Sequence, residues 1–62
     1  MPIVKITLFS GRDKALKKKI AQEITEIMTK NLNIPPEAVI ILFEDIEKHN
    51  FVQAGKTGEE LA

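Results

Sequence analysis

The sequence predicts an α/β fold, a single β-α-β unit with parallel strands plus a short C-terminal hairpin. Three observations support this: alternating side chains at residues 3–9, apolar residues at helical spacing over 14–32, and an uninterrupted apolar run at 39–43. Because a strand–helix–strand order gives a right-handed crossover, the two strands are expected to be parallel. At 62 residues the chain forms one small domain, residues 1–62.

The first strand is expected at residues 3–9. One face carries Val4, Ile6 and Leu8, and the other carries Ile3, Lys5, Thr7 and Phe9. The four residues 10–13 then form a turn, in which Asp13 is placed to cap the following helix.

The helix is expected from Lys14 to about Leu32. Its apolar residues recur at steps of three and four, namely Leu16, Ile20, Ile24, Ile27 and Met28. The prolines at 35 and 36 cannot continue the ladder, so the helix ends before them.

The second strand is expected at residues 39–43, where apolar side chains at every position are typical of a strand buried on both faces. Beyond Ile46 we expect a loop and a short hairpin near residues 51–56. One helix covers only one face of a two-stranded sheet, so the face that holds Ile40 and Leu42 needs cover from outside the chain. A homo-oligomer is the simplest candidate.

Composition excludes several functional classes. Nine basic and nine acidic residues balance, which disfavours general nucleic-acid binding. No apolar run approaches the roughly 20 residues of a membrane span. The absence of cysteine and of a secretion signal fits a cytoplasmic protein.

Two further features are assigned no special role. The three lysines at 17–19 fan around the expected helix and are interpreted as a solvated face. His49 is the single histidine and has no metal-ligand cluster around it, so neither a metal nor a cofactor is expected.

The order and spacing of several short segments resemble the 4-oxalocrotonate tautomerase family. The segments are Met1-Pro2-Ile3, Gly11-Arg12, Asn31-Leu32-Asn33-Ile34-Pro35 and His49-Asn50-Phe51-Val52-Gln53-Ala54-Gly55-Lys56. The resemblance covers nearly the whole chain and implies the tautomerase fold, with pseudo-barrel dimers that usually form a hexamer. It also implies a cofactor-independent isomerase that interconverts enol and keto forms of 2-oxo acids, with an amino-terminal proline as general base.

Pro2 is the candidate catalytic residue once Met1 is removed. A free α-amino group titrates at about 7.7–8.0, against about 10.4 for lysine, and apolar neighbours such as Ile3 and Phe51 would lower that pKa further. A base with a pKa near the working pH moves protons efficiently. If Met1 is retained, the nitrogen is an amide without a basic lone pair. The alternative is that Pro2 merely begins the strand.

Arg12 and Phe51 are the candidate substrate-binding residues. The guanidinium fork suits a carboxylate, although Arg12 could also be a solvated residue beside a helix terminus. Phe51 could wall the pocket, or could belong to the core. Seven strand residues at about 3.3 Å each separate Pro2 from Arg12, whereas Phe51 follows the parallel strand and should lie near Arg12. One site must therefore combine Pro2 of one chain with Arg12 and Phe51 of a neighbour.

The sequence departs from the family pattern at Ile40, where the best-known members carry a second arginine that polarises the substrate carbonyl. Isoleucine cannot do this, which argues against a dicarboxylate substrate. Phe9 and Gln53 stand where dehalogenating relatives would carry extra functional groups, so dehalogenation is not expected. A second hypothesis is a non-catalytic oligomeric relative with an assembly or binding role.

Overall fold

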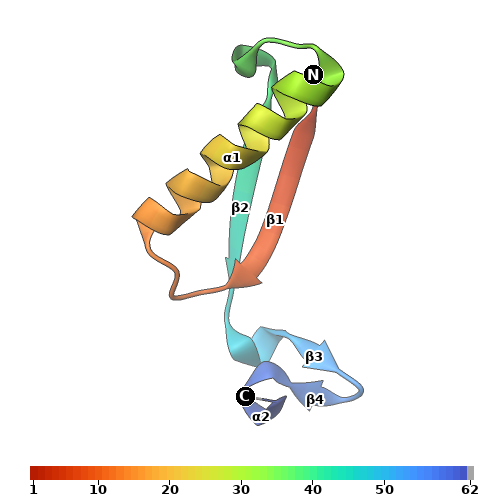
Figure 1. Cartoon of the computed structure of the whole chain (residues 1–62). Helices are drawn as coiled ribbons and strands as arrows, with labels where there is room; N and C mark the ends of the chain where they lie inside the picture. Colours follow the sequence, from red (N-terminus) through yellow and green to blue (C-terminus); the bar gives the residue numbers. More distant parts are fainter. Residues whose placement is uncertain (62) are drawn as a thin grey trace.

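The computed structural model describes residues 1–61. β1 (Ile3–Phe9) and β2 (Ile40–Ile46) lie side by side and parallel, in a register that runs from Ile3 opposite Ile40 to Phe9 opposite Ile46. α1 (Lys14–Leu32) connects them and lies along the sheet (Figure 1). The β-α-β unit and its parallel strands are therefore confirmed.

The C-terminal part projects beyond the carboxyl ends of β1 and β2 (Figure 1). It begins with the 3-10 turn η2 (Lys48–Asn50) and continues into the antiparallel hairpin of β3 (Val52–Gln53) and β4 (Lys56–Thr57). The helical turn α2 (Gly58–Leu61) follows. The hairpin loop needs left-handed backbone, with φ 53° at Ala54 and 79° at Gly55. The predicted hairpin is confirmed.

A cap at each end explains where α1 begins and ends, and the one at Asp13 was predicted. The Asp13 carboxylate accepts the backbone N–H of Leu16 at 2.7 Å, which satisfies one of the free donors of the first turn. At the other end Asn33 adopts a left-handed conformation with φ 56°, and its N–H is donated to the Thr29 carbonyl. The 3-10 turn η1 (Pro36–Ala38) then leads into β2.

The second strand is longer than the apolar run predicts and begins one residue later. It continues through Glu44 and Asp45, which pair with Thr7 and Leu8 of β1. Glu44 accepts the Thr7 hydroxyl at 3.2 Å, and Asp45 binds the Lys17 ammonium. These polar partners allow two carboxylates in the strand, and a hydrophobicity pattern cannot reveal them.

The expectation that β2 is buried on both faces is wrong for the single chain. None of the apolar side chains of residues 1–61 is fully buried, and Leu42 and Ile3 are 51% and 62% exposed. Both lie on the sheet face that α1 does not cover. We therefore still expect this face to be covered by another copy of the chain. Among residues 1–61, no helix is both long enough and apolar enough to cross a membrane.

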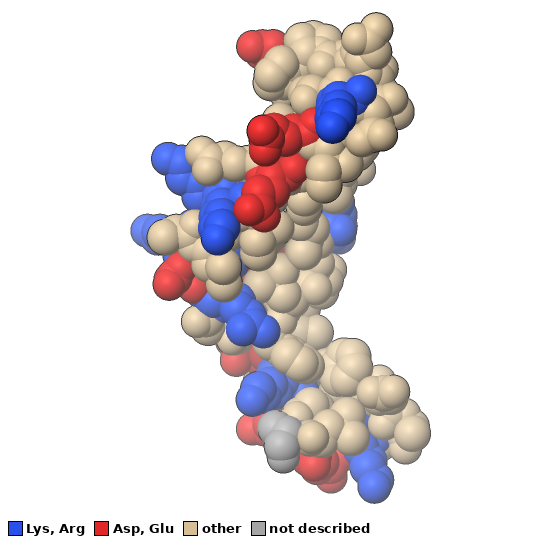
Figure 2. Space-filling view, viewed as in Figure 1, with Lys and Arg blue, Asp and Glu red and all other residues tan. Residues whose placement is uncertain are grey.

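The interpretation of Lys17 as part of a solvated face is also wrong. Its ammonium lies 2.7 and 2.8 Å from the two carboxylate oxygens of Asp45 and 6.0 Å from the centre of the Phe43 ring. Lys18 and Lys19 are exposed, as expected. Figure 2 shows basic and acidic side chains interspersed on the side where α1 lies, without a broad area of one sign.

Candidate active site

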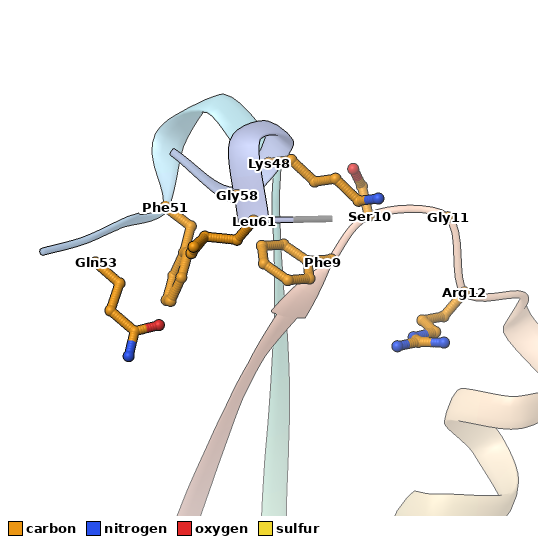
Figure 3. A pocket seen from close by; sticks show the side chains of 9 residues that line it. All are labelled: Phe9, Ser10, Gly11, Arg12, Lys48, Phe51, Gln53, Gly58 and Leu61. Carbon is orange, nitrogen blue, oxygen red and sulfur yellow. The ribbon is translucent and has the colours of Figure 1, made fainter. Parts of the chain in front are cut away.

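An open pocket of about 590 Å³ lies where the end of β1 meets the C-terminal part (Figure 3). It contains both predicted substrate-binding residues, Arg12 and Phe51. The side chains and backbone that line it come from the end of β1, the β1–α1 turn, η2, β3 and α2: Phe9, Ser10, Gly11, Arg12, Lys48, Phe51, Gln53, Gly58 and Leu61.

Phe51 is held in place by its backbone. Its N–H is donated to the Lys48 carbonyl at 3.2 Å, and its own carbonyl accepts the N–H of Gly58 at 2.8 Å. The half-buried Phe51 ring meets Phe9 edge to face, with the ring centres 5.4 Å apart and an interplanar angle of 86°. This favourable aromatic geometry makes Phe9 and Phe51 a joint apolar wall.

The β1–α1 turn positions Arg12. The N–H of Ser10 is donated to the Ile46 carbonyl at 2.9 Å, which fixes the turn to the end of β2. Gly11 has φ 110°, a conformation that other residues rarely adopt. In Figure 3 the Arg12 guanidinium points toward Phe9. The ion pairs within residues 1–61 are Lys5–Glu44 and Lys17–Asp45, so Arg12 has no carboxylate partner in that part of the chain.

Pro2 lies at the opposite end of β1 from this pocket (Figure 1). Its carbonyl accepts the N–H of Ile40 at 3.1 Å, and the seven residues of β1 separate it from the β1–α1 turn. As long as Met1 precedes it, the Pro2 nitrogen is an amide, and removal of the exposed Met1 would make it a secondary amine. The structure therefore brings Arg12 and Phe51 together within one chain and does not bring Pro2 to them.

An apolar strand pair begins next to Pro2. Ile3, the residue after Pro2, is paired with Ile40 of β2.

Sequence reasoning missed two of the polar residues in the pocket. Lys48 lines it from η2, and Gln53, considered only as the place of a dehalogenase group, lines it from β3. The signal for Lys48 was its position three residues before Phe51, which in a 3-10 turn brings both residues to one place. No group of three or more potential metal ligands occurs among residues 1–61.

The pocket can bind an anion next to an apolar group. Two cations, Arg12 and Lys48, line it, and no Asp or Glu is among its lining residues. Phe9, Phe51 and Leu61 supply apolar surface beside them. This combination suits a carboxylate attached to an apolar body.

The chain is similar in sequence to known tautomerases. The sequence matches the tautomerase family model, described as "Tautomerase enzyme", over residues 2–60. A "Probable tautomerase" of Ralstonia nicotianae is 38% identical over 61 residues, which cover 97% of this chain and 94% of that protein. A "Probable tautomerase" of Streptococcus pneumoniae is 36% identical over 56 residues, which cover 90% and 93%.

The fold is similar to that of solved tautomerases. A structure from the characterisation of 4-oxalocrotonate tautomerase isozymes of Methylibium petroleiphilum superposes with a TM-score of 0.91 at 30% identity, covering 97% of this chain and 94% of that one. The match extends over the β-α-β unit and the hairpin together. The chain belongs to the tautomerase family of isomerases.

Proposed function

We propose that the chain catalyses keto–enol tautomerisation of 2-oxo acids without a cofactor, with Pro2 as general base after removal of Met1. The best support is that the candidate base and the candidate substrate-binding residues lie at opposite ends of β1. Arg12 and Phe51 share a pocket at the carboxyl end of β1, and Pro2 stands at its amino end. A family of tautomerases supplies the reaction class.

The reaction moves one proton and shifts two electron pairs. The Pro2 nitrogen takes the proton from the enol hydroxyl, and the oxygen electrons form the carbonyl as the carbon–carbon double bond gives up its pair. The carbon then takes the proton back from the Pro2 ammonium. The base is regenerated, so the net change is an isomerisation.

The site would be shared between subunits. Seven residues at about 3.3 Å each place Pro2 and Arg12 of one chain too far apart to contact one small substrate. The proposed site joins Pro2 of one chain to Arg12 and Phe51 of a neighbour. Arg12 would hold the carboxylate, and the Phe9–Phe51 wall would exclude water from the reacting carbons. A homohexamer is the assembly that the family resemblance implies.

The test begins with protein whose mass shows that Met1 is absent, and measures the ketonisation of phenylenolpyruvate. Pro2→Ala is expected to lower kcat by roughly 100-fold or more, because the ring amine is lost from the position of the base. Arg12→Ala is expected mainly to raise KM, because the carboxylate loses its fork. Lys18→Ala, on the exposed side of α1, is the matched control and should leave both constants unchanged.

The outcomes separate this proposal from a non-catalytic binding role. Wild-type rates in Pro2→Ala would contradict a proline base. Intact oligomers without turnover of this enol or of a dicarboxylate enol, in wild type and variant alike, would favour the non-catalytic relative.

A further inference from the structure

Lys48 reaches the pocket from a different element than Arg12. In Figure 3 its side chain extends from η2 toward Ser10, and it lies on the same side of Phe9 as the Arg12 guanidinium. One cation thus comes from the β1–α1 turn and the other from η2. Both line one pocket only because of the tertiary fold, since they are 36 positions apart in the sequence.

The backbone of Lys48 is fixed where the side chain begins. Its carbonyl accepts the N–H of Phe51 at 3.2 Å. Gly58 packs so closely that an added Cβ would lie 2.7 Å from that carbonyl oxygen. The flexible stem of Lys48 therefore starts from a defined point on the pocket wall.

Within residues 1–61, neither cation of the pocket forms an ion pair. The ion pairs among residues 1–61 involve neither Arg12 nor Lys48, and no Asp or Glu of that part of the chain lines the pocket. Two cations at one open pocket repel each other weakly in the empty site. A bound anion would relieve that repulsion, so its affinity should depend on both groups.

We propose that Lys48 is a second anion-binding residue, which shares the substrate carboxylate with Arg12. The identity of the substrate rests on the proposed function, whereas anion binding does not. Ile3 and Ile40 are paired next to Pro2, whereas Arg12 and Lys48 both line the pocket at the other end of the sheet. The ligand class is an acid with one carboxylate on an aromatic or other apolar body, which packs against Phe9 and Phe51.

A binding experiment tests this without turnover. Benzoate is titrated into the intact assembly and its Kd is read from amide chemical shifts of the pocket residues. Lys48→Ala and Lys48→Gln are each expected to weaken binding roughly three- to tenfold, the range for one charge-assisted contact at an open site. Lys48→Arg should retain most of the affinity. The control Lys56→Ala, exposed and outside the pocket, should bind as wild type does.

The second measurement is the dependence of binding on salt concentration and on the charge of the ligand. Added salt should weaken benzoate binding to wild type more than to Lys48→Gln, because screening acts on a charge that the variant lacks. Benzyl alcohol, of similar shape without the carboxylate, should bind wild type and variant equally. In ketonisation of phenylenolpyruvate, the same variants should raise KM by a similar factor and change kcat less than about twofold.

The outcomes distinguish this inference from the proposed function. Equal benzoate affinity in wild type, Lys48→Ala and Lys48→Gln overturns the role of Lys48, and leaves the proline base untouched. Full activity in Pro2→Ala contradicts the proposed function, and a benzoate site that depends on Lys48 would still stand. Equal weakening of benzyl alcohol would also overturn the inference, because it would indicate a general change in pocket shape.

Discussion

At the scale of single residues, short polar side chains determine where the backbone changes direction. Asp13 illustrates this, because its carboxylate binds the N–H of Leu16 at the start of α1. The same turn carries Arg12 into the pocket. The cap therefore connects the local chemistry of one aspartate to the position of a proposed substrate-binding residue.

Asp13→Ala should lower the free energy of unfolding by about 0.5–2 kcal/mol, the usual cost of losing an N-cap. Asp13→Asn, which keeps the accepting oxygen, should lose much less. Urea denaturation at one fixed chain concentration makes the comparison, because assembly contributes to apparent stability. Equal stability of wild type and Asp13→Ala would contradict the role of the cap.

Single residues could be predicted from the sequence where their partners are near in the sequence, and not where their partners are distant. The Asp13 cap was predicted correctly because its signal is local: a capping residue before a helical pattern. The position of Arg12 in the turn is local as well, and its role stays a prediction. Lys17 was misinterpreted because its partner Asp45 lies 28 positions away. Lys48 was missed for a similar reason, since its pocket forms only when η2 meets the β1–α1 turn.

At the scale of elements, the part of the pocket wall formed by the C-terminal residues depends on the close packing of α2 against η2. Gly58 at the start of α2 lies against Lys48 in η2, with space there for a hydrogen atom only. The Gly58 N–H also binds the Phe51 carbonyl. The position of α2 and the position of Phe51 are therefore coupled.

Gly58→Ala should push η2 and α2 apart, because its Cβ would lie 2.7 Å from the Lys48 oxygen and 3.2 Å from the Lys48 Cα. Overpacking of this kind costs about 1–3 kcal/mol. We expect a lower free energy of unfolding in urea and a higher KM for phenylenolpyruvate. The neighbouring exposed position offers a control, Glu59→Gln, which should change neither. A Gly58→Ala variant with wild-type stability and KM would refute this account of the wall.

Element boundaries were predictable where sequence periodicity was strong. The 19 residues of α1 follow a clear apolar stripe between two caps, and the helix was predicted at its observed bounds. β2 was predicted too short because Glu44 and Asp45 break the apolar pattern, and their partners Thr7, Lys5 and Lys17 come from other elements. Cross-element pairing is not encoded in local periodicity.

At the scale of the whole molecule, the single chain is incomplete in two respects. Its elongated shape, 42 × 24 × 13 Å, leaves no apolar side chain of residues 1–61 fully buried. Its proposed site is divided, with Pro2 at one end of β1 and Arg12 at the other. Association of several copies would cover the sheet face that holds Ile3 and Leu42. It would also bring Pro2 of one chain to Arg12 of another.

The division of the site could be predicted from strand length and topology alone. Seven extended residues fix the separation of Pro2 and Arg12, and the parallel crossover places Phe51 beside Arg12. The contacts between copies could not be predicted in this way, because they depend on the shape of the uncovered sheet face. That face mixes the apolar Ile3 and Leu42 with the ion pair of Lys5 and Glu44.

The most direct test of a shared site is complementation between two variants. Pro2→Ala and Arg12→Ala chains, each lacking Met1, are mixed in equal amounts, dissociated and reassembled, and kcat/KM for phenylenolpyruvate is measured. If each site takes Pro2 from one chain and Arg12 from another, random assembly should restore about a quarter of the wild-type sites. Activity no greater than the mean of the two separately reassembled variants would contradict a site shared between subunits.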